Sequence, residues 1–228
     1  LLAPTTSLIG IWHAAGTLSD ALLPKQSALA LARVHAPKAQ GGQGLHAASL
    51  TTSLIAFVCF SSTAALFGGA GQANYSASNF SLDALATYRR LCAARATCVQ
   101  WTAWSEVGMS ARGAARERTQ QTEATSGIGR IGSAQGLEAL GVVLGNGYPP
   151  VTAAVPIVWG RLMQSSAQLP TFFSTFMPKY GGGAVTSADR PSDRSHVTLD
   201  SIAQIVRRTA SGGEVDADAP IMEIGIDS

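Results

Sequence analysis

LIAFVCF, residues 54–60, is an uninterrupted apolar run that ends in the pair Ser61 and Ser62. A second run, SLIGIW at residues 7–12, is mostly apolar and ends in His13. Short apolar runs that stop at polar residues are typical of buried parallel strands. These two runs are therefore predicted to be parallel strands of an α/β protein.

The rest of the chain continues this alternation of helices and strands. Residues 20–39 are rich in Ala, Leu, Lys and Arg and fit a crossover helix, which Pro37 should kink or restart. Further helices and strands are predicted, in turn, at residues 73–95, 97–104, 134–144 and 151–159. The polar stretch at residues 105–125 is the expected place for a mobile lid.

Composition excludes several classes of protein. Hydrophobic residues make up 46% and charged residues 13% of the 228-residue chain, which is too apolar for disorder. The net charge of +2 includes no basic run of the kind that nucleic-acid binders carry. No apolar run approaches the roughly 18 residues that span a bilayer.

The cysteines and the chain ends indicate where in the cell the protein is expected. Cys59, Cys92 and Cys98 lack the spacing of a metal site, so we predict no metal and expect buried thiols in a reducing compartment. The chain begins without Met and stops within a motif, so both ends are expected to be cut. Cytoplasmic location is the prediction, and targeting to an organelle stays open.

Four polar residues form a candidate catalytic group: Lys38, Ser62, Tyr75 and Asn79. Ser62 follows a predicted strand, and parallel sheets bind ligands beyond the carboxyl ends of their strands. Tyr75 and Asn79 are four residues apart on a predicted helix, so they share a face. Together the four supply what reduction of a carbonyl needs: a proton donor, a second hydrogen-bond donor and a positive charge.

Elementary chemistry suggests a role for each member of this group. A free tyrosine has a pKa of about 10, and we expect the Lys38 ammonium to lower the pKa of Tyr75 so that it delivers its proton readily. Ser62 is expected to donate a hydrogen bond to the developing alkoxide. Asn79 is expected to hold a water or a backbone group that relays protons.

Five motifs give these residues a family context. They are His13-Ala14-Ala15-Gly16, Ala36-Pro37-Lys38, Phe60-Ser61-Ser62, Gly71-Gln72-Ala73-Asn74-Tyr75-Ser76-Ala77-Ser78-Asn79 and Leu82-Asp83-Ala84-Leu85-Ala86. In their order and spacing they resemble the ketoreductase domains of modular polyketide synthases, over residues 9–162. Ordinary short-chain dehydrogenases carry lysine four residues after the tyrosine, whereas Asn79 stands there in this chain and the lysine lies upstream, as in the synthase branch.

The resemblance implies a fold, a cofactor and a reaction. The fold would be the Rossmann-like short-chain dehydrogenase fold with a partial parallel sheet, and the part that carries the cofactor loop would precede Leu1. NADPH would reduce a carrier-bound β-ketoacyl thioester while Tyr75 protonates the oxygen. Cofactor contacts are implied for Lys38, Tyr75, His13, Ala14, Ala15 and Gly16.

The resemblance also bears on the hand of the product. In this family an Asp shortly after the HAAG motif marks one hand, and a Trp eight residues before the tyrosine marks the other. This chain has Asp20 at the first place and Phe67 at the second, although Ser19 replaces the usual first Asp of that motif. The implied product is the D-hydroxy compound.

The C-terminal residues resemble a second kind of domain. Glu223-Ile224-Gly225-Ile226-Asp227-Ser228 is similar to the attachment motif of acyl carrier proteins, in which the serine bears 4′-phosphopantetheine. We therefore expect a ketoreductase portion at residues 1–165, a linker at 166–195 and a truncated, all-α carrier segment at 196–228. The expected partners are an acyl chain on a carrier protein and other synthase domains in cis.

Two alternatives and one decoy accompany this interpretation. A free-standing short-chain dehydrogenase predicts lysine at position 79, which is Asn79 here. A catalytically silent, structural reductase half usually loses the tyrosine or the lysine, and this chain has both. The stretch Gly127-Ile128-Gly129-Arg130-Ile131-Gly132 satisfies GxGxxG, but it follows a polar stretch instead of a strand, so we do not expect it to bind a dinucleotide.

Overall fold

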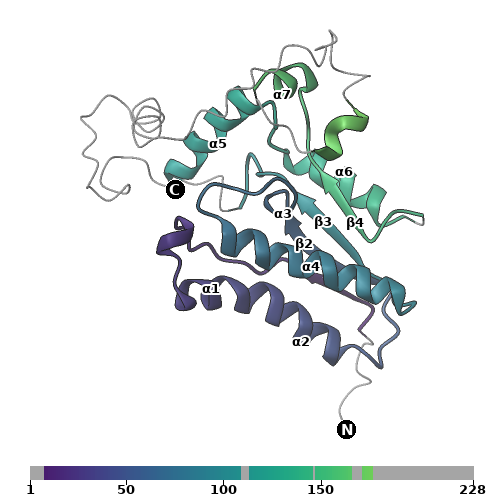
Figure 1. The fold of residues 1–228 in the computed structure, drawn as a ribbon. Coiled ribbons are helices and arrows are strands. Elements are labelled where there is room, and N and C mark those ends of the chain that lie inside the picture. Colours follow the sequence, from purple (N-terminus) through teal and green to yellow (C-terminus); the bar gives the residue numbers. More distant parts are fainter. Residues whose placement is uncertain (1–7, 109–112, 146, 166–170, 177–228) are drawn as a thin grey trace. The chain divides into compact units, whose positions relative to one another are not determined.

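The computed structural model describes residues 8–108, 113–145, 147–165 and 171–176, all within the first of two units, residues 1–182. A parallel sheet with the order β1-β2-β3-β4 forms its centre (Figure 1). The strands are β1 (Gly10–His13), β2 (Ala56–Ser62), β3 (Thr97–Trp101) and β4 (Val151–Ala154). Each strand pairs with the next one along the chain, so the predicted α/β class is confirmed.

Helical segments connect these strands. They are η1 (Leu23–Lys25), α1 (Ala28–His35), η2 (Ala36–Gln40), α2 (Gly41–Ala48), α3 (Ala64–Phe67), α4 (Ala73–Leu91), α5 (Gly113–Ser126), α6 (Ser133–Val143), α7 (Trp159–Ser165) and η4 (Thr171–Thr175).

The first crossover differs from its prediction at both ends. Its helix begins at Ala28, where the Ser27 side chain accepts a hydrogen bond from the backbone of Ala30 at 3.1 Å. It passes through Pro37 as the π-helical turn η2, because proline has no N–H and its ring crowds the preceding turn. The expected interruption at Pro37 is therefore confirmed, but the predicted end at residue 39 is wrong, since α2 continues to Ala48.

The predicted last strand was too long. The ladder of β4 ends at Ala154, and Trp159 begins α7 instead of ending a strand. Pro156 lies in between, and a proline has no N–H to give to a sheet. The apolar residues that follow form a single bridge, between Ile128 and Ile157.

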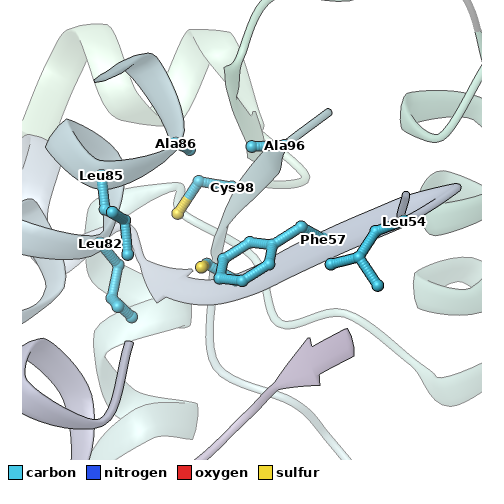
Figure 2. Close-up of a cluster of buried hydrophobic side chains, with 8 residues drawn as sticks. Leu54, Phe57, Leu82, Leu85, Ala86, Ala96 and Cys98 are labelled. Atoms are coloured by element: carbon cyan, nitrogen blue, oxygen red, sulfur yellow. The ribbon is translucent and has the colours of Figure 1, made fainter. Parts of the chain in front are cut away.

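Two apolar clusters cover the two faces of the sheet. Helix α4 packs on β2 and β3 through Leu82, Leu85 and Ala86, whose helical spacing places them on one side. Figure 2 shows these three residues against the side chains from the strands and their approaches, Leu54, Phe57, Ala96 and Cys98.

The second cluster forms from alternate strand residues. Cys98 faces α4, whereas its neighbour Val99 and then Trp101 pack with Val143 of α6 and with Ile131, which precedes that helix. Gly136 of α6 makes room for this packing, since a Cβ there would lie 2.3 Å from the ring of Trp104. Both faces of the central strands β2 and β3 are thus largely buried, which explains why the apolar run of β2 is continuous.

The cysteines are free, as far as the structure describes them. Cys59 and Cys98 are buried as expected, but Cys92, just after α4, is exposed, so that expectation is wrong for Cys92. Within the described ranges, no helix combines the length and apolar character that crossing a membrane requires.

Candidate active site

The sheet and α4 bring Tyr75 and Asn79 to the carboxyl end of β2. The side chain of Asn79 is fully buried, and its Nδ2 donates a hydrogen bond to the backbone carbonyl of Tyr75 at 2.8 Å. Ser61, near the end of β2, donates from Oγ to the carbonyl of Asn79 at 3.3 Å. These bonds tie the first turns of α4 to the strand end where Ser62 lies.

Lys38 reaches the same strand end from η2. Its Nζ donates to the carbonyl of Phe60 at 2.9 Å and lies 5.6 Å from the centre of the Tyr75 ring. Only 4% of the side chain is exposed, although it carries a charge. The structure therefore brings Lys38 next to Tyr75, as the sequence predicts, although the two residues are far apart along the chain.

Two residues of the HAAG motif, His13 and Gly16, lie against Lys38. The Nε2 of His13 lies 3.0 Å from the carbonyl of Lys38, to which it donates when that nitrogen carries the proton. Gly16 faces the side chain, and a Cβ there would lie 2.9 Å from Cε and 3.4 Å from Nζ of Lys38. His13 is 5% exposed, so its visible role is to hold the backbone of Lys38.

Burial sets the proton affinities of the two central groups. It raises the pKa of Tyr75, and hydrogen bonding with Asn79 and Ser62 lowers that pKa by less. Burial also lowers the pKa of Lys38. The expected net lowering of the Tyr75 pKa is therefore wrong, because loss of water around the phenol outweighs the favourable neighbours. Tyr75 is protonated at neutral pH, which is the state that a proton donor needs.

Ser62 and Asn79 retain hydrogen-bonding capacity toward a ligand. The Oγ of Ser62 accepts from the backbone N–H of Ala64 at 3.1 Å, which leaves its own O–H as a donor. The Oδ1 of Asn79 is buried and has no hydrogen-bond partner in the part of the chain that the structure describes. A buried amide oxygen of this kind suits a bound water or a hydroxyl group.

The segment with Asp20 docks on the start of α4. Asp20 accepts a hydrogen bond from the side chain of Gln72 at 3.0 Å, and the side chain of Asn74 donates to the carbonyl of Ser19 at 2.7 Å. Gly71, with φ +72°, turns the chain so that its carbonyl accepts from the N–H of Ala21. Asp20 is close enough that its charge contributes to raising the pKa of Tyr75.

Phe67 belongs to a group that we call the aromatic cluster, made of Phe67, Trp159, Phe172, Phe173 and Phe176. The ring of Phe67 lies 5.7 Å from that of Phe173 and 6.1 Å from that of Phe172, both of which stack with it. Phe172 and Phe173 come from η4, in the stretch where the sequence predicts a linker. The signal that sequence reasoning passed over is this pair of adjacent phenylalanines.

The GxGxxG stretch has a packing role. It joins α5 to α6, and a Cβ at Gly127 (φ +75°) would lie 2.6 Å from the backbone of Leu162. A Cβ at Gly129 would lie 3.2 Å from Pro156. These glycines allow close approach of the chain after β4. Next to them, Glu123 on α5 pairs with Arg130 at 2.7 Å.

Two further predictions concern a metal site and the attachment serine. No group of three or more His, Cys, Asp or Glu side chains that suits a metal ion occurs among the residues that the structure describes. Ser228, the predicted attachment serine, lies outside them.

Comparison with known proteins finds similarity to a family of reductase domains and to large synthases. Residues 2–106 match the model of the KR domain. The phthioceranic/hydroxyphthioceranic acid synthase of Mycobacterium tuberculosis (strain ATCC 25618 / H37Rv) is 35% identical over 235 residues, which cover 96% of this chain and 10% of that protein. Polyketide synthase GfsB of Streptomyces halstedii is 38% identical over 61% of this chain and 2% of its own length.

A solved structure supports the same conclusion. An A-type ketoreductase from a modular polyketide synthase superposes with a TM-score of 0.65 at 31% identity, covering 71% of this chain and 34% of that one. The chain thus spans about a tenth of the curated synthase from Mycobacterium and a third of the solved ketoreductase chain. In its four-stranded fold and in residues 2–106, this chain is similar to the ketoreductase domains of polyketide synthases.

Proposed function

We propose that this chain supplies the catalytic residues for NADPH-dependent reduction of a carrier-bound β-ketoacyl thioester to a β-hydroxyacyl thioester. The observation that carries the proposal is the meeting of Lys38, Ser62, Tyr75 and Asn79 at the carboxyl end of β2. Carbonyl reduction needs a proton at the oxygen, and a neutral, half-enclosed phenol beside a buried cation meets that need.

Each side chain has a task in this proposal. Tyr75 gives its hydroxyl proton to the oxygen that becomes the alcohol. The O–H of Ser62 donates a hydrogen bond to the same oxygen and stabilises the negative charge that develops on it. Asn79, with its unpartnered Oδ1, holds the water or hydroxyl group through which a proton returns to Tyr75.

Lys38 and the turn after β1 fit the nicotinamide ribose of NADPH. The Lys38 ammonium has three N–H donors and gives one to the carbonyl of Phe60, so donors remain for ribose hydroxyls. Tyr75 and residues His13, Ala14, Ala15 and Gly16 are the further proposed contacts. The chemistry that NADPH supplies when bound is hydride donation to the β-carbon of the ketone.

The proposed product is the D-hydroxy compound. Asp20 lies beside the start of α4 and acts electrostatically on Tyr75, which supports a part in orienting the substrate. Phe67, at the position of the alternative marker, packs in the aromatic cluster. Chiral analysis of the alcohol tests this assignment, and an L-hydroxy product would overturn it.

The carrier segment is part of the same proposal. The match to the mycobacterial synthase extends over 96% of the chain, which supports a common domain order through its C-terminal part. We propose a ketoreductase portion at residues 1–165, a linker at 166–195 and a carrier segment at 196–228, in a cytoplasmic synthase. Phosphopantetheinyl transferase should add the arm to Ser228, and an arm that is still added to the Ser228→Ala variant would contradict this site.

Substitution of Tyr75 tests the reductase function. In the full synthase polypeptide, Tyr75→Phe should lower the rate of reduction at least 100-fold, since general acid catalysis contributes about 10²–10⁴-fold. NADPH binding, followed by fluorescence, should weaken by about tenfold at most, because the variant loses one proposed hydrogen bond and keeps the other contacts. Tyr88→Phe is the matched control, because Tyr88 is an exposed residue near the other end of α4.

The same measurement separates the rival functions. A wild-type protein that folds but reduces no β-keto thioester would favour a catalytically silent, structural half. Reduction of free sterols or sugars in preference to thioesters would favour a free-standing dehydrogenase. Equal turnover by Tyr75→Phe and wild type would contradict the proposed mechanism.

A further inference from the structure

Asp83 is a buried carboxylate that the catalytic roles leave unused. It lies two helical turns after Tyr75 on α4 and is 4% exposed. Among the residues that the structure describes, it is the one Asp or Glu counted as buried. A buried carboxylate costs free energy unless donors and a positive charge compensate it, so its partners indicate what it does.

Two donors from β3 hold the carboxylate. Oδ2 accepts from Nε2 of Gln100 at 2.8 Å, and Oδ1 accepts from Sγ of Cys98 at 3.1 Å. Cys98 can donate because hydrogen bonding to Cys59, burial and the Asp83 charge raise the pKa of its thiol. Neither partner is a cation, so these two bonds leave the charge of Asp83 without a neutralising neighbour on β3.

The polar contacts continue across the sheet toward Lys38. Cys98 is the direct register partner of Cys59 on β2. Phe60, the next residue along β2, accepts the hydrogen bond from Nζ of Lys38. The carboxylate and the ammonium are therefore held over neighbouring strands, and both are almost fully buried, where charges interact strongly.

We propose that Asp83 is a positioning residue for the reaction, whose buried carboxylate keeps the ammonium group of Lys38 charged and directed at the carboxyl end of β2. This inference rests on the catalytic role of Lys38 given above. Its physical basis is that a cation deprived of water needs a fixed opposite charge to remain protonated.

Electrostatic interactions around Lys38 agree with this arrangement. Burial lowers the pKa of Lys38, while Cys98, Cys59 and Asp83 act to raise it. Cys98 stays a neutral thiol at ordinary pH because its own pKa is raised, so it adds no negative charge beside Lys38. The titratable groups that face Lys38 from the packed elements are His13 of β1, Cys59 of β2, Tyr75 and Asp83 of α4, and Cys98 of β3.

Lysine NMR tests the proposal without substrate or cofactor. Selective ¹³C labelling of lysine Cε follows Lys38, whose signal is the one that disappears in Lys38→Arg, and Lys25 is assigned in the same way. Removal of the anion in Asp83→Asn should lower the titration midpoint of Lys38 by about one pH unit. Exposed Lys25 should not change and serves as the internal control.

A matched variant separates charge from packing. Gln100→Leu removes the 2.8 Å hydrogen bond to Asp83 but keeps the carboxylate, so the Lys38 midpoint should stay within about 0.3 units of wild type. If Asp83→Asn does not fold, Asp83→Glu takes its place, and it should keep the Lys38 midpoint near that of wild type because the charge is retained. An unchanged Lys38 midpoint in folded Asp83→Asn, or a shifted one in Asp83→Glu, would overturn the proposal.

Activity gives a second, independent readout. In the full synthase, the alkaline loss of reductase activity should begin about one pH unit lower in Asp83→Asn, because Lys38 loses its proton earlier. A shifted NMR midpoint with an unshifted activity profile would show that Asp83 acts on Lys38 but that Lys38 does not limit the reaction. That result would overturn the role proposed for Asp83 in the reaction, whereas the Tyr75→Phe experiment would still decide the reductase function separately.

Discussion

The surroundings of Lys38 and the aromatic cluster are held together by different forces. Lys38 sits among hydrogen bonds to backbone carbonyls, and its charge is buried, which costs stability. The aromatic cluster contains no charge and gains its energy from stacked rings and buried area. The comparison teaches that burial of the Lys38 charge lowers the stability of the first region, whereas packing of aromatic rings raises the stability of the region around Phe67.

The largest effect is expected in the aromatic cluster. Phe173→Ala should lower the free energy of unfolding by about 3 kcal/mol, because Phe173 is 4% exposed and touches the rings of Phe67 and Trp159. Phe176→Ala, which truncates a ring that is 42% exposed, should cost about 1 kcal/mol. Denaturant unfolding measures both, and equal losses would show that η4 does not pack as described.

A smaller effect, on catalysis, is expected at Gly16. The Cβ of Gly16→Ala would press on Cε of Lys38 at 2.9 Å, and this flexible side chain can yield without unfolding the protein. We expect reductase activity to fall about tenfold, or about 1.4 kcal/mol of barrier, with an unfolding midpoint near that of wild type. Gly44→Ala on α2, where a Cβ would meet no neighbouring side chain or other segment within 4 Å, is the control and should keep full activity. Wild-type activity in Gly16→Ala would separate the position of Lys38 from catalysis.

The smallest effect concerns Tyr75, whose ionisation state should not change near neutral pH. Burial raises the pKa of Tyr75 above 10.0, so the phenol should stay protonated from pH 6 to pH 9 and ionise only above its ordinary range. Because an acid works in its protonated form, ionisation of Tyr75 should not limit activity below pH 10. The difference in ultraviolet absorbance between wild type and Tyr75→Phe measures phenolate directly. Phenolate below pH 9 would contradict the raised pKa.

Much of the fold follows from local patterns. The apolar runs around Trp12 and Val58 and the helical spacing of Leu82 and Leu85 predict strands and a helix that the structure contains. Element ends were less predictable, since Pro37 interrupts its helix without ending it and Pro156 ends its strand early. Whether a helix absorbs a proline depends on the packing around it, which no local pattern contains.

The candidate site shows the same division between sequence and structure. By itself, the sequence determined which residues are candidates for the chemistry, because Tyr75 and Asn79 share a helix face and Ser62 lies at the end of a strand. Only the tertiary structure decided how Lys38 behaves among them. Its burial, its bond to Phe60 and its coupling to Asp83 depend on strands and helices meeting from distant parts of the chain. Proton affinity follows the loss of water around a group, and only the folded chain removes that water.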